Sequence, residues 1–166
     1  MSTDDHDSRR RIVEWDDPTI GARAGRTLSG MQYLEAMKSG ALPAPPITRL
    51  VGFALHTLEA GRVVFEFTPG EEHANPMAGT HGGVLTTVLD SAMGCAIASK
   101  LAAGQGYTTL ELKINFVRPV THATPKLFGE GRIVHLGSKT ATAEGFLRDA
   151  EGKLYSHATT TCLIFS

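Results

Sequence analysis

The stretch NPMAGTHGGVLTTVLDSAMGCAIA, residues 75–98, contains the most apolar helix that the sequence predicts. From position 84 onward its side chains leave almost no polar stripe, and a helix that is apolar nearly all round is buried nearly all round. We therefore predict a helix over residues 82–101 that the rest of the chain encloses. One acid, Asp90, lies in its middle, although burying an ionised carboxylate is costly unless it is paired or hydrogen-bonded.

Strand patterns flank this helix on both sides. Residues 47–70 predict two strands that meet at a turn near Glu59–Gly61, with Val63, Phe65 and Phe67 on one face. Four further strands are expected at 107–119, 125–137, 139–150 and 153–166. This order favours an α+β fold in which an antiparallel sheet wraps around one central helix.

The best alternation of apolar and polar residues in the chain lies in TLELKINF, residues 109–116. Leu110, Leu112, Ile114 and Phe116 interleave there with polar side chains, so we expect only one face of the sheet to be dry at this strand.

The segment before the first strand divides into three parts. Residues 1–28 are polar and lack periodicity, which predicts a flexible arm to which we assign no function. Ser29 and Gly40 bound a short amphipathic helix as its cap and its stop, and residues 42–46 form an extended, proline-rich connector. We expect residues 29–166 to fold as one domain.

Composition excludes several classes of protein. The formal net charge is −1 and the basic residues form no block beyond Arg9–Arg11, so no nucleic-acid partner is expected. No apolar run is long enough for a membrane span or signal peptide, which predicts a cytoplasmic protein without a membrane partner. Cys95 and Cys162 lack metal-ligand spacing and are expected to be buried, reduced thiols, and the histidines also lack such spacing, so no metal is expected.

Asp90 has two structural explanations and one functional one. The carboxylate could face a solvated gap or bond the backbone, or it could cap a helix shorter than the one predicted. Aspartate is a poor residue in the middle of a helix, and the apolar residues on both sides of position 90 argue against a cap there. We therefore favour an acid that points into a cleft where the chemistry requires it.

The start of the same helix offers a second half of a site. Gly82 and Gly83 place backbone N–H groups at the positive end of the helix dipole, where they can stabilise an oxyanion that develops on a substrate carbonyl. Thr87 and Gly94 share the helix face of Asp90 and Gly83, but the acid lies about 10 Å further along the helix. One chain cannot bring both groups to the same carbonyl carbon, so we infer a site shared between subunits related by a two-fold axis.

The segment NPMAGTHGGVLTTVLDSAMGCA resembles the central motif of hotdog-fold acyl-CoA thioesterases, especially those of the phenylacetate-degradation (PaaI-like) branch. Asn75 precedes His81 by six positions, and His81 precedes Asp90 by nine, as in that family's pattern. The resemblance extends from Pro46 to Phe165 and includes the strands that follow the helix. Residues 1–28 lie outside it.

The resemblance implies a role for each residue of the motif. Asp90 would be the catalytic carboxylate, as nucleophile or as general base. Gly82 of the opposite subunit would polarise the thioester carbonyl through its N–H, and Asn75 would position water or the acid. His81 would shape the turn and bond near the thioester, and Thr109 would place a polar group near the sulfur or the attacking water. For these last two, a purely structural role stays open.

Substrate-binding residues follow from the same comparison. Gly94 occupies a position where another branch of the family has a hydroxyl residue, which puts a preference for hydroxybenzoyl groups in doubt. Arg118, Arg132 and Lys139 lie at strand ends or in a turn, where they could contact coenzyme A phosphates or be ordinary solvated charges.

The sequence therefore predicts a hotdog-fold acyl-CoA thioesterase that forms a homodimer, paired again into a homotetramer. It would need no cofactor, because coenzyme A is part of the substrate. Two alternatives remain: a hotdog dehydratase or hydratase acting on an acyl thioester, and a non-catalytic acyl-CoA binding module.

Overall fold

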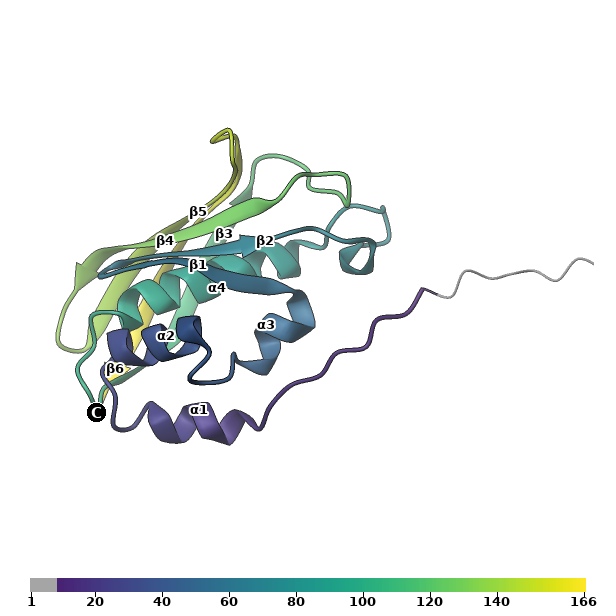
Figure 1. The fold of residues 1–166 in the computed structure, drawn as a ribbon. Coiled ribbons are helices and arrows are strands. Elements are labelled where there is room, and N and C mark those ends of the chain that lie inside the picture. Colours follow the sequence, from purple (N-terminus) through teal and green to yellow (C-terminus); the bar gives the residue numbers. More distant parts are fainter. Residues whose placement is uncertain (1–8) are drawn as a thin grey trace, which may run out of the picture.

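The computed structural model describes residues 9–166 and forms one antiparallel sheet around a long helix (Figure 1). The six strands lie in the spatial order β1-β2-β4-β5-β6-β3. The predicted order of two strands, a helix and four strands is confirmed, and the arrangement is the hotdog fold. Its elements are β1 (Phe53–Glu59), β2 (Arg62–Phe67), a short 3-10 helix η1 (Glu71–His73), α4 (Gly82–Ala98), β3 (Gly106–Phe116), β4 (Leu127–Leu136), β5 (Thr140–Asp149) and β6 (Leu154–Phe165).

The core forms where α4 packs against the inner face of the sheet. Val88, Leu89 and Met93 have no solvent exposure. Gly131 of β4 lies directly against the backbone of Ala92, so that even a Cβ atom would overlap the helix there. This glycine lets the helix approach the sheet closely along its buried face, whereas the face that carries Thr87, Asp90 and Cys95 is only half-buried.

α4 ends at Ala98, three residues before the predicted end. The Ser99 hydroxyl donates to the carbonyl of Ala96 at 2.6 Å and accepts from the N–H of Gly61 at 2.8 Å. The C-terminus of the helix is thereby fixed to the turn between β1 and β2. Among residues 9–166, no helix has both the length and the apolar content needed to cross a membrane.

The strict alternation expected in β3 is wrong at Leu110. Thr109 pairs with Cys162 and Glu111 with Thr161, so Leu110 is an extra residue that forms a β-bulge and is 58% exposed. A bulge reverses the direction of every side chain on one side of it relative to the other. Thr109 therefore faces α4 before the bulge, and Leu112 faces the core after it.

For the chain before the sheet, one expectation is confirmed and one is wrong. The helix α2 (Gly30–Ser39) is confirmed, with Ser29 in a capping box and Gly40 in the left-handed conformation. The strand expected from residue 47 is wrong in its first part, because residues 46–51 form the helix α3 (Pro46–Val51). Proline in the first turn fixes a helical φ, and Gly52, at φ +83°, ends the helix before β1 begins.

A further helix, α1 (Pro18–Ala24), lies in the range where no element is predicted. The Asp17 side chain caps it by accepting from the N–H of Thr19 at 2.9 Å. Gly21 is buried against the ring of Tyr33 from α2. Figure 1 shows α1 on the far side of α2 from the sheet. The first eight residues of the predicted arm lie outside the described residues.

Candidate active site

Asp90 lies in the middle of α4 and is half-buried beside β3. The Thr109 hydroxyl donates to its Oδ1 atom at 3.0 Å. Among residues 9–166, no backbone N–H bonds this carboxylate, and its Oδ2 atom has no hydrogen-bond partner. The helix runs unbroken from Gly82 to Ala98, so the interpretation of Asp90 as the cap of a shorter helix is wrong. One oxygen of the Asp90 carboxylate is thus hydrogen-bonded to Thr109, and the other is available to a ligand.

The bulge at Leu110 explains why Thr109 reaches Asp90. Without the extra residue, Thr109 would share a face with Glu111 and Lys113, which are exposed. The same hydroxyl lies 3.9 Å from the Sγ atom of Cys162 on β6. Thr109 is therefore enclosed between the helix and the neighbouring strand, and its side chain is directed at the carboxylate.

The two thiols near Asp90 are poor nucleophiles. Burial and the negative charge of Asp90 raise the pKa of Cys95 to about 12. Burial also raises the pKa of Cys162, against the hydrogen bonds from Thr109 and Thr160. A thiol reacts as its thiolate, so neither cysteine is suited to attack a carbonyl near neutral pH. The carboxylate is the remaining candidate in this region.

At the start of α4, one backbone N–H is left without a protein acceptor. His81 is the N-cap, and its Nδ1 atom accepts from the N–H of Gly83 at 2.9 Å. The N–H of Val84 donates to the carbonyl of His81 at 3.0 Å. Among residues 9–166, the N–H of Gly82 has no acceptor. The described geometry therefore leaves Gly82, rather than Gly83, as the donor available to a ligand.

The ring of Phe116, at the end of β3, covers Gly82. A Cβ atom on Gly82 would come within 2.9 Å of that ring. Phe116 is 50% exposed, so the ring lies at the surface of the molecule beside the helix start. The alternation of apolar residues in β3 includes Phe116, but that pattern alone would assign it to the core and not to the start of α4.

Asn75 and His81 organise the loop that leads into α4. The Asn75 Oδ1 atom accepts from the N–H groups of Met77 at 2.9 Å and Gly79 at 3.2 Å. The N–H of His81 donates to the carbonyl of His73 at 2.8 Å. Within one subunit, both side chains thus support the helix start, and no hydrogen bond joins either of them to Asp90 in residues 9–166.

Thr87 and Gly94 lie on α4 on either side of Asp90. The Thr87 hydroxyl donates to the carbonyl of Gly83 at 2.9 Å, within the helix. Gly94 is buried against the phenol of Tyr107, whose Oη atom would lie 2.5 Å from a Cβ atom on this glycine. Sequence reasoning missed Tyr107, although its position two residues before Thr109 is a signal that the two share a strand face.

The three predicted phosphate-binding cations are dispersed. Arg118 donates from Nε to the carbonyl of Leu154 at 3.2 Å, and Lys139 is exposed in the turn between β4 and β5. Arg132 forms an ion pair with Glu130 on the sheet face opposite α4. The structure does not bring these residues together within one subunit.

Glu130 holds two arginines on that outer face. Arg62 bonds it at 2.6 Å and Arg132 bonds its other oxygen. Burial would raise the pKa of Glu130, but the hydrogen bonds from Arg132 and Arg62 outweigh burial and lower it. The carboxylate is therefore committed to its two arginines, which leaves Arg132 a structural partner within the subunit.

Asp90 and Gly82 are eight positions apart on one helix, which corresponds to about 12 Å along its axis. A carboxylate that attacks a carbonyl and an N–H that binds the carbonyl oxygen must both lie close to one carbon atom. The two groups of a single chain do not meet this condition.

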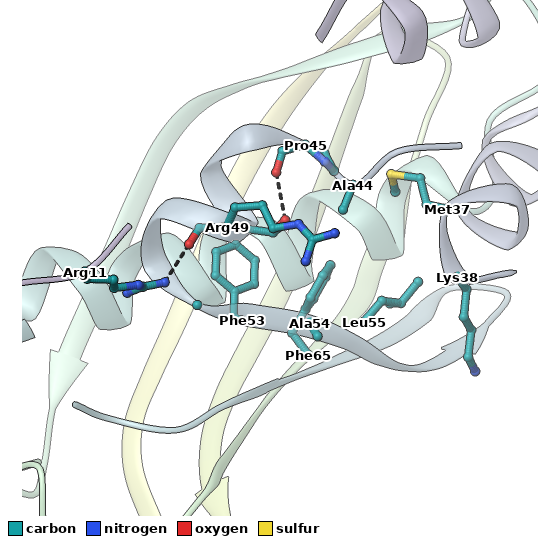
Figure 2. Close-up of a pocket in the computed structure, with 12 residues that line it drawn as sticks. Arg11, Met37, Lys38, Ala44, Pro45, Arg49, Phe53, Ala54, Leu55 and Phe65 are labelled. Atoms are coloured by element: carbon teal, nitrogen blue, oxygen red, sulfur yellow. Dashed lines mark hydrogen bonds between the residues drawn. The ribbon is translucent and has the colours of Figure 1, made fainter. Parts of the chain in front are cut away.

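A hollow of about 470 Å³ lies at the opposite edge of the sheet, beside β1 (Figure 2). Phe53, Leu55 and Phe65 form an apolar floor, and Arg11 donates to the carbonyl of Arg49 at its rim. None of the predicted site residues lines it. It is separate from the region of Asp90, because β1 and β3 are the two outer strands of the sheet.

Comparison with known proteins identifies the class. The sequence pattern of the thioesterase superfamily matches residues 79–156. A candidate esterase from Saccharolobus solfataricus is 31% identical over 115 residues, covering 69% of this chain and 80% of that protein. The chain belongs to the thioesterase superfamily, a class of hydrolases. The family predicted from the motif around Asp90 is confirmed.

Solved structures agree with this fold. A phenylacetic acid degradation-related protein from Ralstonia eutropha has a TM-score of 0.72 and 27% identity, covering 79% of this chain and 98% of that one. A Streptococcus mutans protein solved with acetyl-CoA has a TM-score of 0.62 and 23% identity, covering 69% of this chain and 89% of that one. Within residues 9–166, no three His, Cys, Asp or Glu side chains gather as metal ligands would.

Proposed function

We propose that this chain hydrolyses acyl-CoA thioesters to the free acid and coenzyme A, with Asp90 as the catalytic carboxylate. The observation that carries the proposal is a half-buried acid in an apolar helix, held by Thr109 at one oxygen and free at the other. Membership of the thioesterase superfamily supports the reaction class. The acetyl-CoA bound by the Streptococcus mutans neighbour supports coenzyme A as the leaving group.

The site forms between two copies of the chain. β3 is an outer strand, and Leu110 and Phe116 are exposed along it. An open, apolar strand edge is suited to pairing with another strand. Antiparallel pairing of β3 with its own copy sets residues near its beginning opposite residues near its end.

This pairing accounts for the distance between the two catalytic groups. Asp90 contacts β3 at Thr109, near the beginning of the strand, whereas Gly82 contacts it at Phe116, its last residue. Two-fold pairing about the middle of β3 therefore brings Gly82 of one subunit toward Asp90 of the other. We propose a homodimer with two such sites, paired again into a homotetramer.

In this site, the N–H of Gly82 donates to the thioester oxygen and stabilises the charge that develops on it. Asp90 either attacks the carbonyl carbon or takes a proton from an attacking water. In both routes the carbon–sulfur bond breaks and the coenzyme A sulfur leaves. Attack by Asp90 gives an anhydride that water hydrolyses, and both routes end in free acid and protonated thiol. The substrate supplies the coenzyme A, so the proposal includes no further cofactor.

Thiol release from a panel of acyl-CoA thioesters tests the reaction. Asp90→Asn should lower turnover by about 100-fold or more, as loss of a nucleophile or base does. Glu35→Gln, at an exposed acid on α2, is the matched control and should retain wild-type turnover. Acyl-CoA binding without thiol release in the wild type would instead identify a binding module, and release of a hydrated product would identify a hydratase.

Subunit mixing tests whether the site is shared. Gly82→Pro removes the N–H, and proline is tolerated in the first turn of a helix. Because the added Cβ would meet the Phe116 ring, both partners are prepared in a Phe116→Leu background. Mixed dimers of the Gly82→Pro and Asp90→Asn chains contain one intact site. Mixing should restore about a quarter of the background activity, whereas no recovery after confirmed exchange would show that both groups act within one chain.

A further inference from the structure

A pocket of about 400 Å³ lies between α1, α2, the C-terminal half of α4 and the beginning of β3. A cavity of about 150 Å³ is already large enough for benzene, so this pocket has room for a group well beyond an acetyl. Its walls include Gly25, Leu28, Tyr33, Cys95, Ala98 and Tyr107.

The pocket lies beside the same helix as Asp90, about two turns beyond it, and Asp90 itself does not line it. Gly94 lies one helical turn beyond the acid and Ala98 one turn further, so all three share a face of α4. Tyr107 precedes Thr109 by two positions on β3 and packs its phenol against Gly94. Tyr107, which also lines the pocket, therefore lies between the acid and the pocket, and an acyl group bound at Asp90 would have to pass its side chain to enter.

The walls of the pocket carry no charged side chain. Tyr33 and Tyr107 present hydroxyl groups there, and neither hydroxyl has a hydrogen-bond partner among residues 9–166. Burial raises the pKa of both phenols, so they remain neutral near pH 7. Such a lining is suited to an uncharged apolar group and unsuited to phosphate or to a second carboxylate.

The far wall of the pocket comes from α1 and the residues that follow it. These residues lie outside the 79–156 match to the thioesterase superfamily. Gly25, the C-cap of α1, has the helical angles φ −61° and ψ −16°, and a Cβ atom there would lie 3.9 Å from the Tyr33 ring. A side chain at this position would fit the backbone, and because Gly25 lines the pocket it would take up space there.

The inner wall is fixed by the contact between α2 and α4. Gly30 lies directly against the carbonyl of Ala98, so that any side chain at this glycine would overlap the end of α4. The N–H of Gly30 also donates to the carbonyl of Leu101 at 3.0 Å. α2 is thereby tied to the end of α4, and α1 packs on α2 through Gly21 and Tyr33.

We propose that this pocket receives the acyl group of the thioester, an uncharged apolar group of about six carbon atoms or more, and that α1 closes its far end and limits acyl length. This inference rests on the proposed thioesterase function and adds the substrate class. α1 is then a specificity-determining element that this chain adds to its fold.

Gly25→Leu tests the role of α1 in the full-length protein. The added side chain shortens the pocket, and one methylene group in an apolar pocket changes discrimination by about 10- to 200-fold. We expect the ratio of kcat/KM for octanoyl-CoA over acetyl-CoA to fall at least about tenfold. Thr27→Leu, two positions away and not a part of the wall, is the matched control and should leave the ratio unchanged. An unchanged ratio in Gly25→Leu, with the helical circular dichroism spectrum retained, would overturn the proposal.

A binding measurement separates this proposal from the proposed reaction. The probe is octyl-coenzyme A, a thioether that cannot be hydrolysed, titrated calorimetrically into the Asp90→Asn protein with and without Gly25→Leu. Weaker binding with Gly25→Leu supports the pocket even if the wild type releases no thiol from any acyl-CoA. Equal binding of octyl-coenzyme A by both proteins refutes the pocket, even if the wild type proves to be an active thioesterase.

Discussion

Replacing Thr109 with valine tests how the carboxylate is positioned. Valine keeps the shape of threonine and its packing against Cys162, but it removes the hydroxyl that donates to Asp90 at 3.0 Å. A hydrogen bond to a charged group contributes about 1.5–3 kcal/mol. If the whole of this contribution serves to orient the acid in the transition state, kcat should fall by roughly 10- to 150-fold.

The assay is steady-state thiol release, with kcat and KM determined separately. Because Thr109 acts through Asp90, we expect the loss in kcat with KM nearly unchanged, and Thr109→Ser should recover most of the activity by restoring the hydroxyl. The unfolding midpoint should change little, since Asp90 is only half-buried and water can reach it. A Thr109→Val protein with full kcat, or a Thr109→Ser protein as impaired as the valine variant, would refute the reasoning.

Three further predictions concern stability and reactivity. Gly131→Val should destabilise the fold by about 1–3 kcal/mol or more in urea denaturation, because its Cβ would overlap the Ala92 backbone, whereas Gly145→Ala meets only side-chain atoms, those of Met93 and Leu89, and should cost less. The lowered pKa of Glu130 stabilises the fold above the ordinary value of 4.5, and this stabilisation is lost as pH falls through the folded-state pKa. Glu130→Gln should therefore be less stable than wild type at pH 7 in thermal denaturation, with the difference vanishing in acid. Cys95, with a pKa of about 12, should resist iodoacetamide at pH 8 in the native protein and react after unfolding, as followed by mass spectrometry.

The order of elements could be predicted because apolar periodicity reports burial directly. An apolar helix followed by four alternating strands has few ways to bury its surface, and a sheet around the helix is the simplest of them. The same reasoning identified Asp90, since an acid among buried residues contrasts with its surroundings.

The features that place the side chains of the site were not predictable from periodicity. A strand with one extra residue still reads as alternating on each side of the bulge, so the pattern in β3 assigned Leu110 to the core. The segment of α3 is typical of a strand by composition because Ile47, Thr48 and Val51 are β-branched, whereas Pro46 and Gly52 fix the backbone as a short helix. α1 is too short and too exposed to show an apolar stripe, so its contact with α2 could be found only in three dimensions.

In the proposed dimer, β3 links the two proposed catalytic groups to the interface between subunits. Its beginning holds Asp90 through Thr109, its last residue covers Gly82, and its outer edge is free for a second copy. The bulge at Leu110 lies between these two contacts, so it allows both ends of the strand to face α4 although Thr109 and Phe116 are seven positions apart, an odd offset that would place them on opposite faces of a regular strand. A strand without the bulge could direct only one of these side chains toward the helix. We infer that the bulge is the feature that would allow a single strand to serve both halves of the proposed shared site.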